Sequence, residues 1–88
     1  MKVKNTAKKI IIIYILNVIR LYSSPMAPVS QTAICNYLND IEIFCDRKTV
    51  GRNIEYLCEF GYPIKKVNGK GYYITEEDIK NTKNKLVL

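Results

Sequence analysis

Residues 45–64, CDRKTVGRNIEYLCEFGYPI, contain the strongest helix signals of this chain and the entry to a hairpin. Asp46 is a favoured helix N-cap, and its charge suits the positive end of a helix. Gly61 stands where a left-handed C-terminal cap belongs. The stretch therefore predicts a helix that begins at residue 47 and ends at about residue 60.

The two faces of this predicted helix differ in character. Three apolar residues recur at helical spacing and define a core face: Val50, Ile54 and Leu57. At 100° per residue, three charged residues point the opposite way: Lys48, Arg52 and Glu55. Thr49 and Tyr56 fall on the flank between these faces. The helix therefore packs on a core and presents a charged face at its first turns.

After Gly61 the apolar period changes from that of a helix to two. The pair Asn68-Gly69 separates the short runs 64–67 and 72–74, which is a strong signal for a β-hairpin. Pro63 precedes the first run, where its missing N–H does no harm. We expect an antiparallel hairpin directly behind the charged helix.

The first 22 residues predict another helix, which starts near Thr6 or Ala7 and ends at Tyr22 or Ser23. Its isoleucines favour a strand by propensity, but the apolar pattern continues for more than fifteen residues without Gly or Pro. About thirteen mostly apolar residues are too few to span a membrane, which takes about 20. A signal peptide would have a similar basic start, but no small-x-small cleavage site follows.

Two shorter elements complete the pattern. Ser30 is a good N-cap for a helix of about nine residues that ends near Asn39-Asp40, and Val29 can pack on Ile34 as a hydrophobic staple. The run Thr75-Glu76-Glu77-Asp78 has the form of a helix start, so the tail is either a short fourth helix or a frayed end. We divide the chain into a domain over residues 1–75 and a tail over 76–88.

Composition limits the chemistry available to the chain. It has 88 residues, a net charge of +6 and no histidine, which removes catalytic arrangements built on histidine. Cys35, Cys45 and Cys58 are odd in number and form no CxxC pair, so we expect free thiols in the cytoplasm, no metal site and no disulfide framework. Cys45 precedes a basic helix start, which favours a lowered thiol pKa. We nevertheless expect no catalytic residue, no cofactor and no enzyme.

The position of the charge is more informative than its total. Residues 46–71 hold six bases and three acids, hence +3, and residues 1–20 hold five bases and no acid. Three helices followed by a hairpin, with bases on the third helix, predict an α+β fold of the winged helix-turn-helix type, in which that helix enters the major groove of DNA. The alternative is that Lys48 and Arg52 pair with Glu55 or Glu59 on an ordinary solvated face.

Residues 12–74 resemble the N-terminal winged-helix domain of WYL-domain transcriptional regulators, a group related to the DeoR-like helix-turn-helix proteins. The matching phrases are IIYILNVIRLYSS, VSQTAICNYLN, CDRKTVGRNIEYLCEFGYPI and VNGKGYYI. The resemblance implies that four residues face DNA: Arg47, Lys48, Thr49 and Arg52. Asn53 stands where the family usually has an acid. Because residues 76–88 do not resemble the region that follows in longer members, the ligand-sensing role is not carried over.

We therefore expect a sequence-specific module for double-stranded DNA that acts as a homodimer, with neither a membrane nor a small-molecule ligand as partner. Lys48 and Arg52 are the expected base-reading residues, because Arg and Lys favour guanine O6 and N7. The residues expected on the DNA backbone are Arg47, Thr49, Tyr56, Lys65, Lys66 and Lys70. For Tyr56 the alternative, an aromatic residue that simply lies on the helix surface, is the favoured interpretation. The alternative function is a protein-interaction winged helix, an adaptor or a phage-type inhibitor, since tyrosine and arginine are enriched at interfaces.

Overall fold

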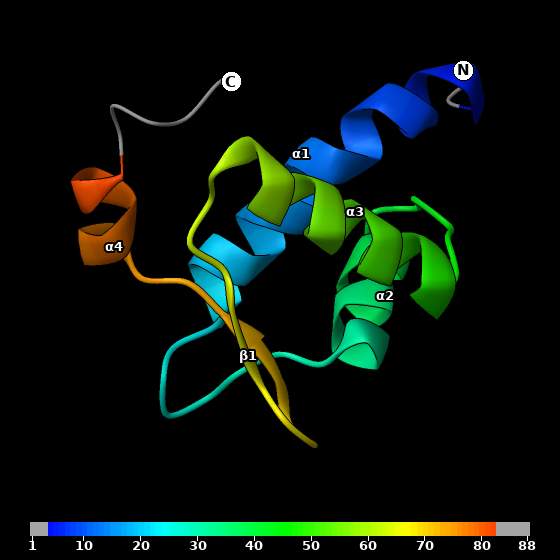
Figure 1. The fold of residues 1–88 in the computed structure, drawn as a ribbon. Helices are drawn as coiled ribbons and strands as arrows, with labels where there is room; N and C mark the ends of the chain where they lie inside the picture. Colours follow the sequence, from blue (N-terminus) through cyan, green and yellow to red (C-terminus); the bar gives the residue numbers. More distant parts are fainter. Residues whose placement is uncertain (1–3, 83–88) are drawn as a thin grey trace.

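The computed structural model describes the chain from residue 4 to residue 82, and its side chains from residue 10 (Figure 1). The elements follow in the order α1 (Lys4–Tyr22), α2 (Gln31–Asp40), α3 (Arg47–Phe60), β1 (Lys65–Val67), β2 (Gly71–Tyr73) and α4 (Glu76–Asn81). Three helices followed by an antiparallel hairpin confirm the predicted α+β, winged-helix-like fold. We call the hairpin, residues 65–73, the wing.

The long apolar N-terminal segment is a helix, as its length predicts, and not a strand. It begins at Lys4, two residues before the predicted Thr6, and ends at Tyr22 as predicted. In Figure 1 α3 crosses in front of α1, and the two pack against each other. Among the described residues, no helix is long and apolar enough to cross a membrane.

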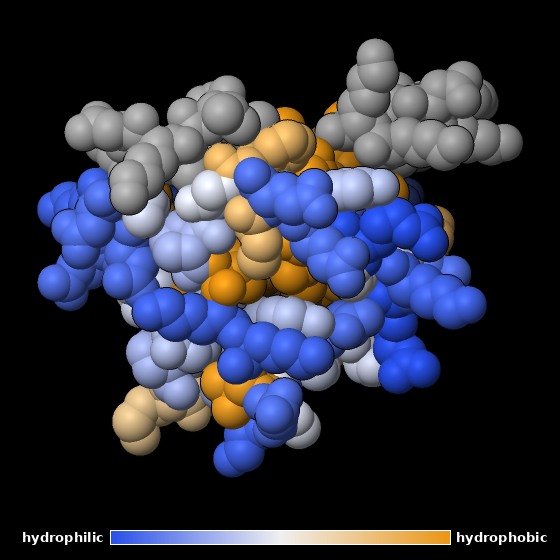
Figure 2. All heavy atoms as spheres, in the orientation of Figure 1, coloured by the Kyte–Doolittle hydropathy of each residue, from blue (hydrophilic) through white to orange (hydrophobic). Residues whose placement is uncertain are grey.

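One apolar core holds the three helices and the end of the wing together. Its buried members are Ile11, Ile15, Leu16, Val18, Ile19, Val29, Ile34, Leu38, Val50, Ile54, Leu57 and Ile74. Seen from outside, hydrophilic residues cover most of the face in Figure 2, and apolar side chains show between them near the middle. Since α1 supplies five of the core residues, it is the central helix onto which α2 and α3 pack.

The predicted cap of α2 is confirmed. The Ser30 hydroxyl accepts a hydrogen bond from the N–H of Ala33 at 3.0 Å, which satisfies one of the free donors of the helix start. Val29 and Ile34 are both buried in the same core, consistent with the predicted staple. The helix therefore starts at Gln31, where the local sequence places it.

The caps of α3 are also confirmed. The Asp46 carboxylate accepts a hydrogen bond from the N–H of Thr49 at 2.8 Å. Hydrogen bonding to Thr49 holds the pKa of the Asp46 carboxyl below its usual value. Gly61 has φ of 110°, a left-handed conformation, and its N–H donates to the carbonyl of Cys58. The two caps fix both ends of α3, and with them the direction of its charged face.

The wing pairs Lys65 with Tyr73, Lys66 with Tyr72 and Val67 with Gly71. Its turn is closed by the N–H of Lys70, which donates to the carbonyl of Val67 at 2.9 Å, with Gly69 at φ of 78°. The Asn-Gly signal therefore identified the turn correctly.

The sequence pattern gave no sign that a third segment joins the wing. Val29 and Tyr72 exchange two backbone hydrogen bonds of 2.8 Å, so the residue before the α2 cap lies alongside β2. Gly71 permits this close approach, because a Cβ there would overlap the carbonyl group of Val29. The wing is thus attached to the segment that leads into α2.

The tail forms a short helix, α4, and is not frayed over residues 76–81. Thr75 caps it by accepting from the N–H of Asp78 at 3.0 Å. Arg20 donates to both oxygens of Glu76, at 2.9 and 3.0 Å, and so ties α4 to α1. In Figure 1 α4 lies at the opposite side of the molecule from α2. For the expected homodimer, the sequence offers two candidate contact surfaces, the long first helix and the apolar residues 86–88 of the tail. Residues 86–88 lie outside the described residues.

The expectation of a lowered pKa at Cys45 is wrong. Burial raises the pKa of the Cys45 thiol to about 11, with a further contribution from the neighbouring Cys35, and burial also raises the pKa of Cys35. Desolvation of the thiolate is the largest cause, and the negative charge of Asp46 raises the pKa further. Cys35, Cys45 and Cys58 are free thiols.

Candidate nucleic-acid interface

The outward face of α3 presents its bases at the N-terminal half. Lys48 and Arg52 are exposed, while the core face of the same helix is buried, as the spacing predicts. Over residues 10–82 the ion pairs are Arg20–Glu76 and Lys65–Asp78. Lys48 and Arg52 therefore form no ion pair with Glu55 or Glu59 in this part of the chain. The structure therefore does not show the alternative, in which these bases are neutralised by carboxylates on the same helix.

Two adjoining hollows lie between α3 and the wing. The first, of about 250 Å³, lies at the starts of α2 and α3 and includes Arg47, Lys66 and Lys70 in its lining. The second, of about 390 Å³, runs along α3 and includes Lys48, Arg52 and Lys66. Lys66 lines both, so the hollows meet at the middle of the wing.

We call the surface around these hollows the basic groove and define it by five residues: Arg47, Lys48, Arg52, Lys66 and Lys70. Five of the eight residues predicted to contact DNA thus come together, from two elements that are separate in the sequence. Their charges face a shared concave surface, with one carboxylate, Glu55, at its edge. Such a surface concentrates a positive field and attracts a polyanion.

Lys65 is not part of the basic groove. Successive residues of a strand point to opposite faces, so Lys65 and Lys66 diverge. The Lys65 ammonium lies 3.5 Å from the Asp78 carboxylate of α4, and Lys65 lines neither hollow. The structure therefore places this predicted backbone contact beside α4.

Thr49 and Tyr56 lie on the flank of α3 and line neither hollow. Thr49 is half-buried, and its backbone carbonyl accepts from the Asn53 side chain at 2.9 Å. Tyr56 is 45% exposed. A ligand that contacts them has to extend past α3 on that flank.

A polar bridge at the floor of the groove is the feature that the sequence reasoning missed. The Gln31 side-chain amide donates to the backbone carbonyl of Arg47 at 2.7 Å. Its oxygen accepts from the Tyr72 hydroxyl at 3.1 Å. Gln31 thereby joins the start of α2, the start of α3 and the wing. The only local signal was Gly51, a helix-interior glycine that destabilises a helix by roughly 0.5–1 kcal/mol relative to alanine.

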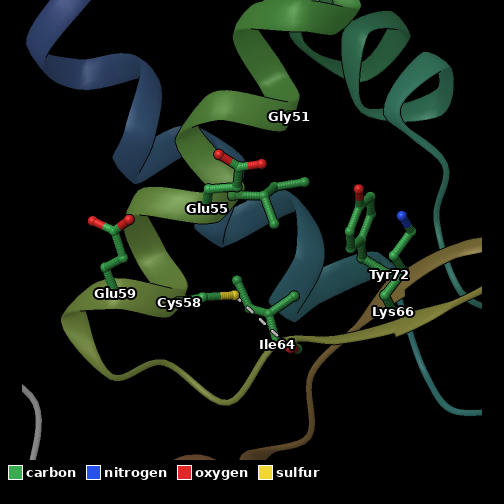
Figure 3. A pocket seen from close by; sticks show the side chains of 8 residues that line it. Gly51, Glu55, Cys58, Glu59, Ile64, Lys66 and Tyr72 are labelled. Carbon is green, nitrogen blue, oxygen red and sulfur yellow. Dashed lines mark hydrogen bonds between the residues drawn. The ribbon is translucent and has the colours of Figure 1, made fainter.

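The C-terminal half of α3 has the opposite charge. A further hollow of about 380 Å³ is lined there by Glu55, Cys58 and Glu59 from α3, facing Ile64 and the wing (Figure 3). Burial raises the pKa of the Cys58 thiol, and both carboxylates add to the effect. The thiol donates to the Ile64 carbonyl at 3.9 Å. An anion is therefore attracted to the N-terminal half of α3 and repelled from the C-terminal half.

Comparison with protein-family models, with curated proteins and with solved structures gave no match to this chain. Among the described residues, no three His, Cys, Asp or Glu side chains are grouped so that they could hold a metal ion. The basic groove and the residues around it are therefore the features that indicate a function for this chain.

Proposed function

We propose that this chain is a sequence-specific double-stranded DNA-binding module of a transcriptional regulator. The observation that carries the proposal is the basic groove, in which five bases from α3 and the wing converge without an internal ion pair over residues 10–82. An unneutralised cluster of this kind in a winged-helix-like fold favours a polyanion over an uncharged partner.

In the proposed complex the N-terminal half of α3 enters the major groove. Lys48 and Arg52, the most outward bases, contact guanine O6 and N7. Arg47, Lys66 and Lys70, which surround the first hollow, hold phosphates and set the register. The acidic C-terminal half of α3 then lies away from the duplex, which explains the separation of charge along the helix.

We further propose that the module belongs with the winged-helix domains of WYL-domain regulators and works in the cytoplasm as a homodimer. Support for the family comes from the phrases of residues 12–74, and support for the compartment from three cysteines that remain free thiols. A single module of this size buries little surface on DNA, so two copies on two half-sites give the affinity that one lacks.

The test is the salt dependence of binding to a mixed-sequence duplex, measured by fluorescence anisotropy. With three to five phosphate contacts, log K against log salt should fall with a slope between about −2.7 and −4.5. Because every phosphate contact releases counterions, a flat slope, or no binding to any duplex at low salt, would contradict the proposal. Selection of bound duplexes from a random library then gives the preferred sequence.

A protein partner is the second candidate function, and a separate surface favours it. Tyr22 and Tyr37 stack with ring centroids 4.3 Å apart at the surface between α1 and α2, and Met26 is 93% exposed nearby in sequence. Exposed aromatic and methionine side chains are enriched at protein interfaces. Alanine at Tyr22 and Tyr37 should leave duplex binding unchanged if DNA is the ligand of the basic groove.

A further inference from the structure

Gln31 makes two hydrogen bonds that connect the parts of the basic groove. One runs to the Arg47 carbonyl, 2.7 Å away in the first turn of α3. The other comes from the Tyr72 hydroxyl on β2, at 3.1 Å. Gln31 and Tyr72 also line both hollows of the groove. A single side chain thus spans the gap between the recognition-type helix and the wing.

Gly51 provides the space that this side chain occupies. A Cβ on Gly51 would lie 2.9 Å from Nε2 of Gln31, the nitrogen that donates to Arg47. The contact is with the far end of a flexible side chain, so the amide would have to shift. A shift would disturb its hydrogen bonds, whereas glycine at 51 leaves room for them. A glycine that weakens α3 by propensity is thereby explained by the position of Gln31.

From this arrangement we infer that Gln31 is a positioning residue that locks the wing to the start of α3 and so sets the width of the basic groove, with Gly51 as its required neighbour. The inference rests on the proposed function for its consequence in DNA binding. The lock itself is a property of the free protein. Its two parts are therefore tested by separate measurements.

The lock predicts how Lys66 and Lys70 reach the phosphates. The wing is a two-stranded hairpin that is also attached by the backbone pairing of Tyr72 with Val29 and by an ion pair from β1 to α4. Neither of these contacts involves α3. Gln31 bridges β2 to the start of α3, so the wing bases and α3 bases meet a duplex as one prearranged surface.

A thermal-stability cycle on the free protein tests the lock. In a Gln31→Ala background, Gly51→Ala should raise Tm by about 2–8 °C, because alanine is the better helix former and nothing obstructs its Cβ. In the wild-type background the same change should leave Tm unchanged or lower it, since the displaced amide weakens its two hydrogen bonds. An equal rise in both backgrounds would overturn the lock. The side-chain amide resonance of Gln31 should also shift in Tyr72→Phe and stay in place in Tyr73→Phe.

Duplex titrations test the consequence for binding. Gln31→Ala and Tyr72→Phe should each weaken the preferred duplex by about two- to tenfold, and the double variant should lose no more than the larger single loss. Tyr73→Phe, on the other face of β2, is the matched control and should bind as the wild type does. If Gln31→Ala binds DNA as the wild type does, the positioning role is refuted. If the wild-type protein binds no duplex, the proposed function fails while the stability cycle still decides the lock.

Discussion

Lys65 and Lys66 are adjacent on β1, yet the structure assigns them different environments, and this contrast gives a quantitative prediction. Lys66 lines both hollows of the basic groove, whereas Lys65 lies 3.5 Å from Asp78. Replacing Lys66 with alanine removes one phosphate contact, so the slope of log K against log salt should flatten by about 0.9. Wild-type binding therefore weakens more steeply with salt than binding by the variant. When salt rises about fourfold, from about 50 to 200 mM, the ratio of wild-type to variant affinity should fall by roughly threefold.

Lys65→Ala is the matched control, because it removes the same charge from the same strand. Its slope should stay within about 0.3 of the wild-type value. The lost pair with Asp78 is exposed and should lower the free energy of unfolding by less than about 1 kcal/mol. Fluorescence anisotropy at five salt concentrations measures both slopes. Equal flattening in the two variants would show that the wing acts only through its total charge, and would refute the assignment of Lys66 to the groove.

Three further predictions concern single side chains. Arg52→Ala should cost about 1–3 kcal/mol on the preferred duplex and much less on random duplex, as competition titrations would show; equal losses would remove Arg52 from base reading. Glu55 lies at the edge of the basic groove, where its carboxylate should repel phosphates. Glu55→Gln should therefore strengthen binding to random duplex by about two- to fivefold and reduce the discrimination between preferred and random duplex. Weaker binding by this variant would argue against the repulsion. Arg20 donates to Glu76 and holds the pKa of that carboxyl below its usual value. The stabilisation is therefore complete above the unfolded-state pKa of about 4.3 and is lost as pH falls through the depressed folded value. The Tm of the wild type should exceed that of Glu76→Gln at pH 7, and the difference should shrink steadily as the pH is lowered below about 4.3.

Helix and turn boundaries were predictable because neighbouring residues determine them. Ser30, Asp46 and Thr75 each cap a helix through the N–H three residues further on, and Gly61 ends α3 in a left-handed conformation. None of these contacts depends on the rest of the fold. The apolar spacing of α3 likewise predicted its buried face.

Contacts between elements were not predictable in the same way. Gln31 reaches Arg47 and Tyr72, which are 16 and 41 residues away, and no period in the sequence connects them. Strand alternation separates Lys65 from Lys66, but which of the two faces α3 depends on how the wing is attached through Val29. The thiol pKa of Cys45 depends chiefly on burial, which the neighbouring charges in the sequence do not reveal.

In the proposed complex the basic groove is the surface that contacts DNA. A titration of the ¹⁵N-labelled protein with its selected duplex, followed by NMR, shows residue by residue where the duplex binds. The largest amide shifts should fall at the starts of α2 and α3 and along the wing, at residues 30–32, 47–52 and 66–72, with little change around Tyr22 and Tyr37. Shifts centred on Tyr22 and Tyr37, with residues 47–52 unmoved, would contradict the claim and favour the protein-interaction function.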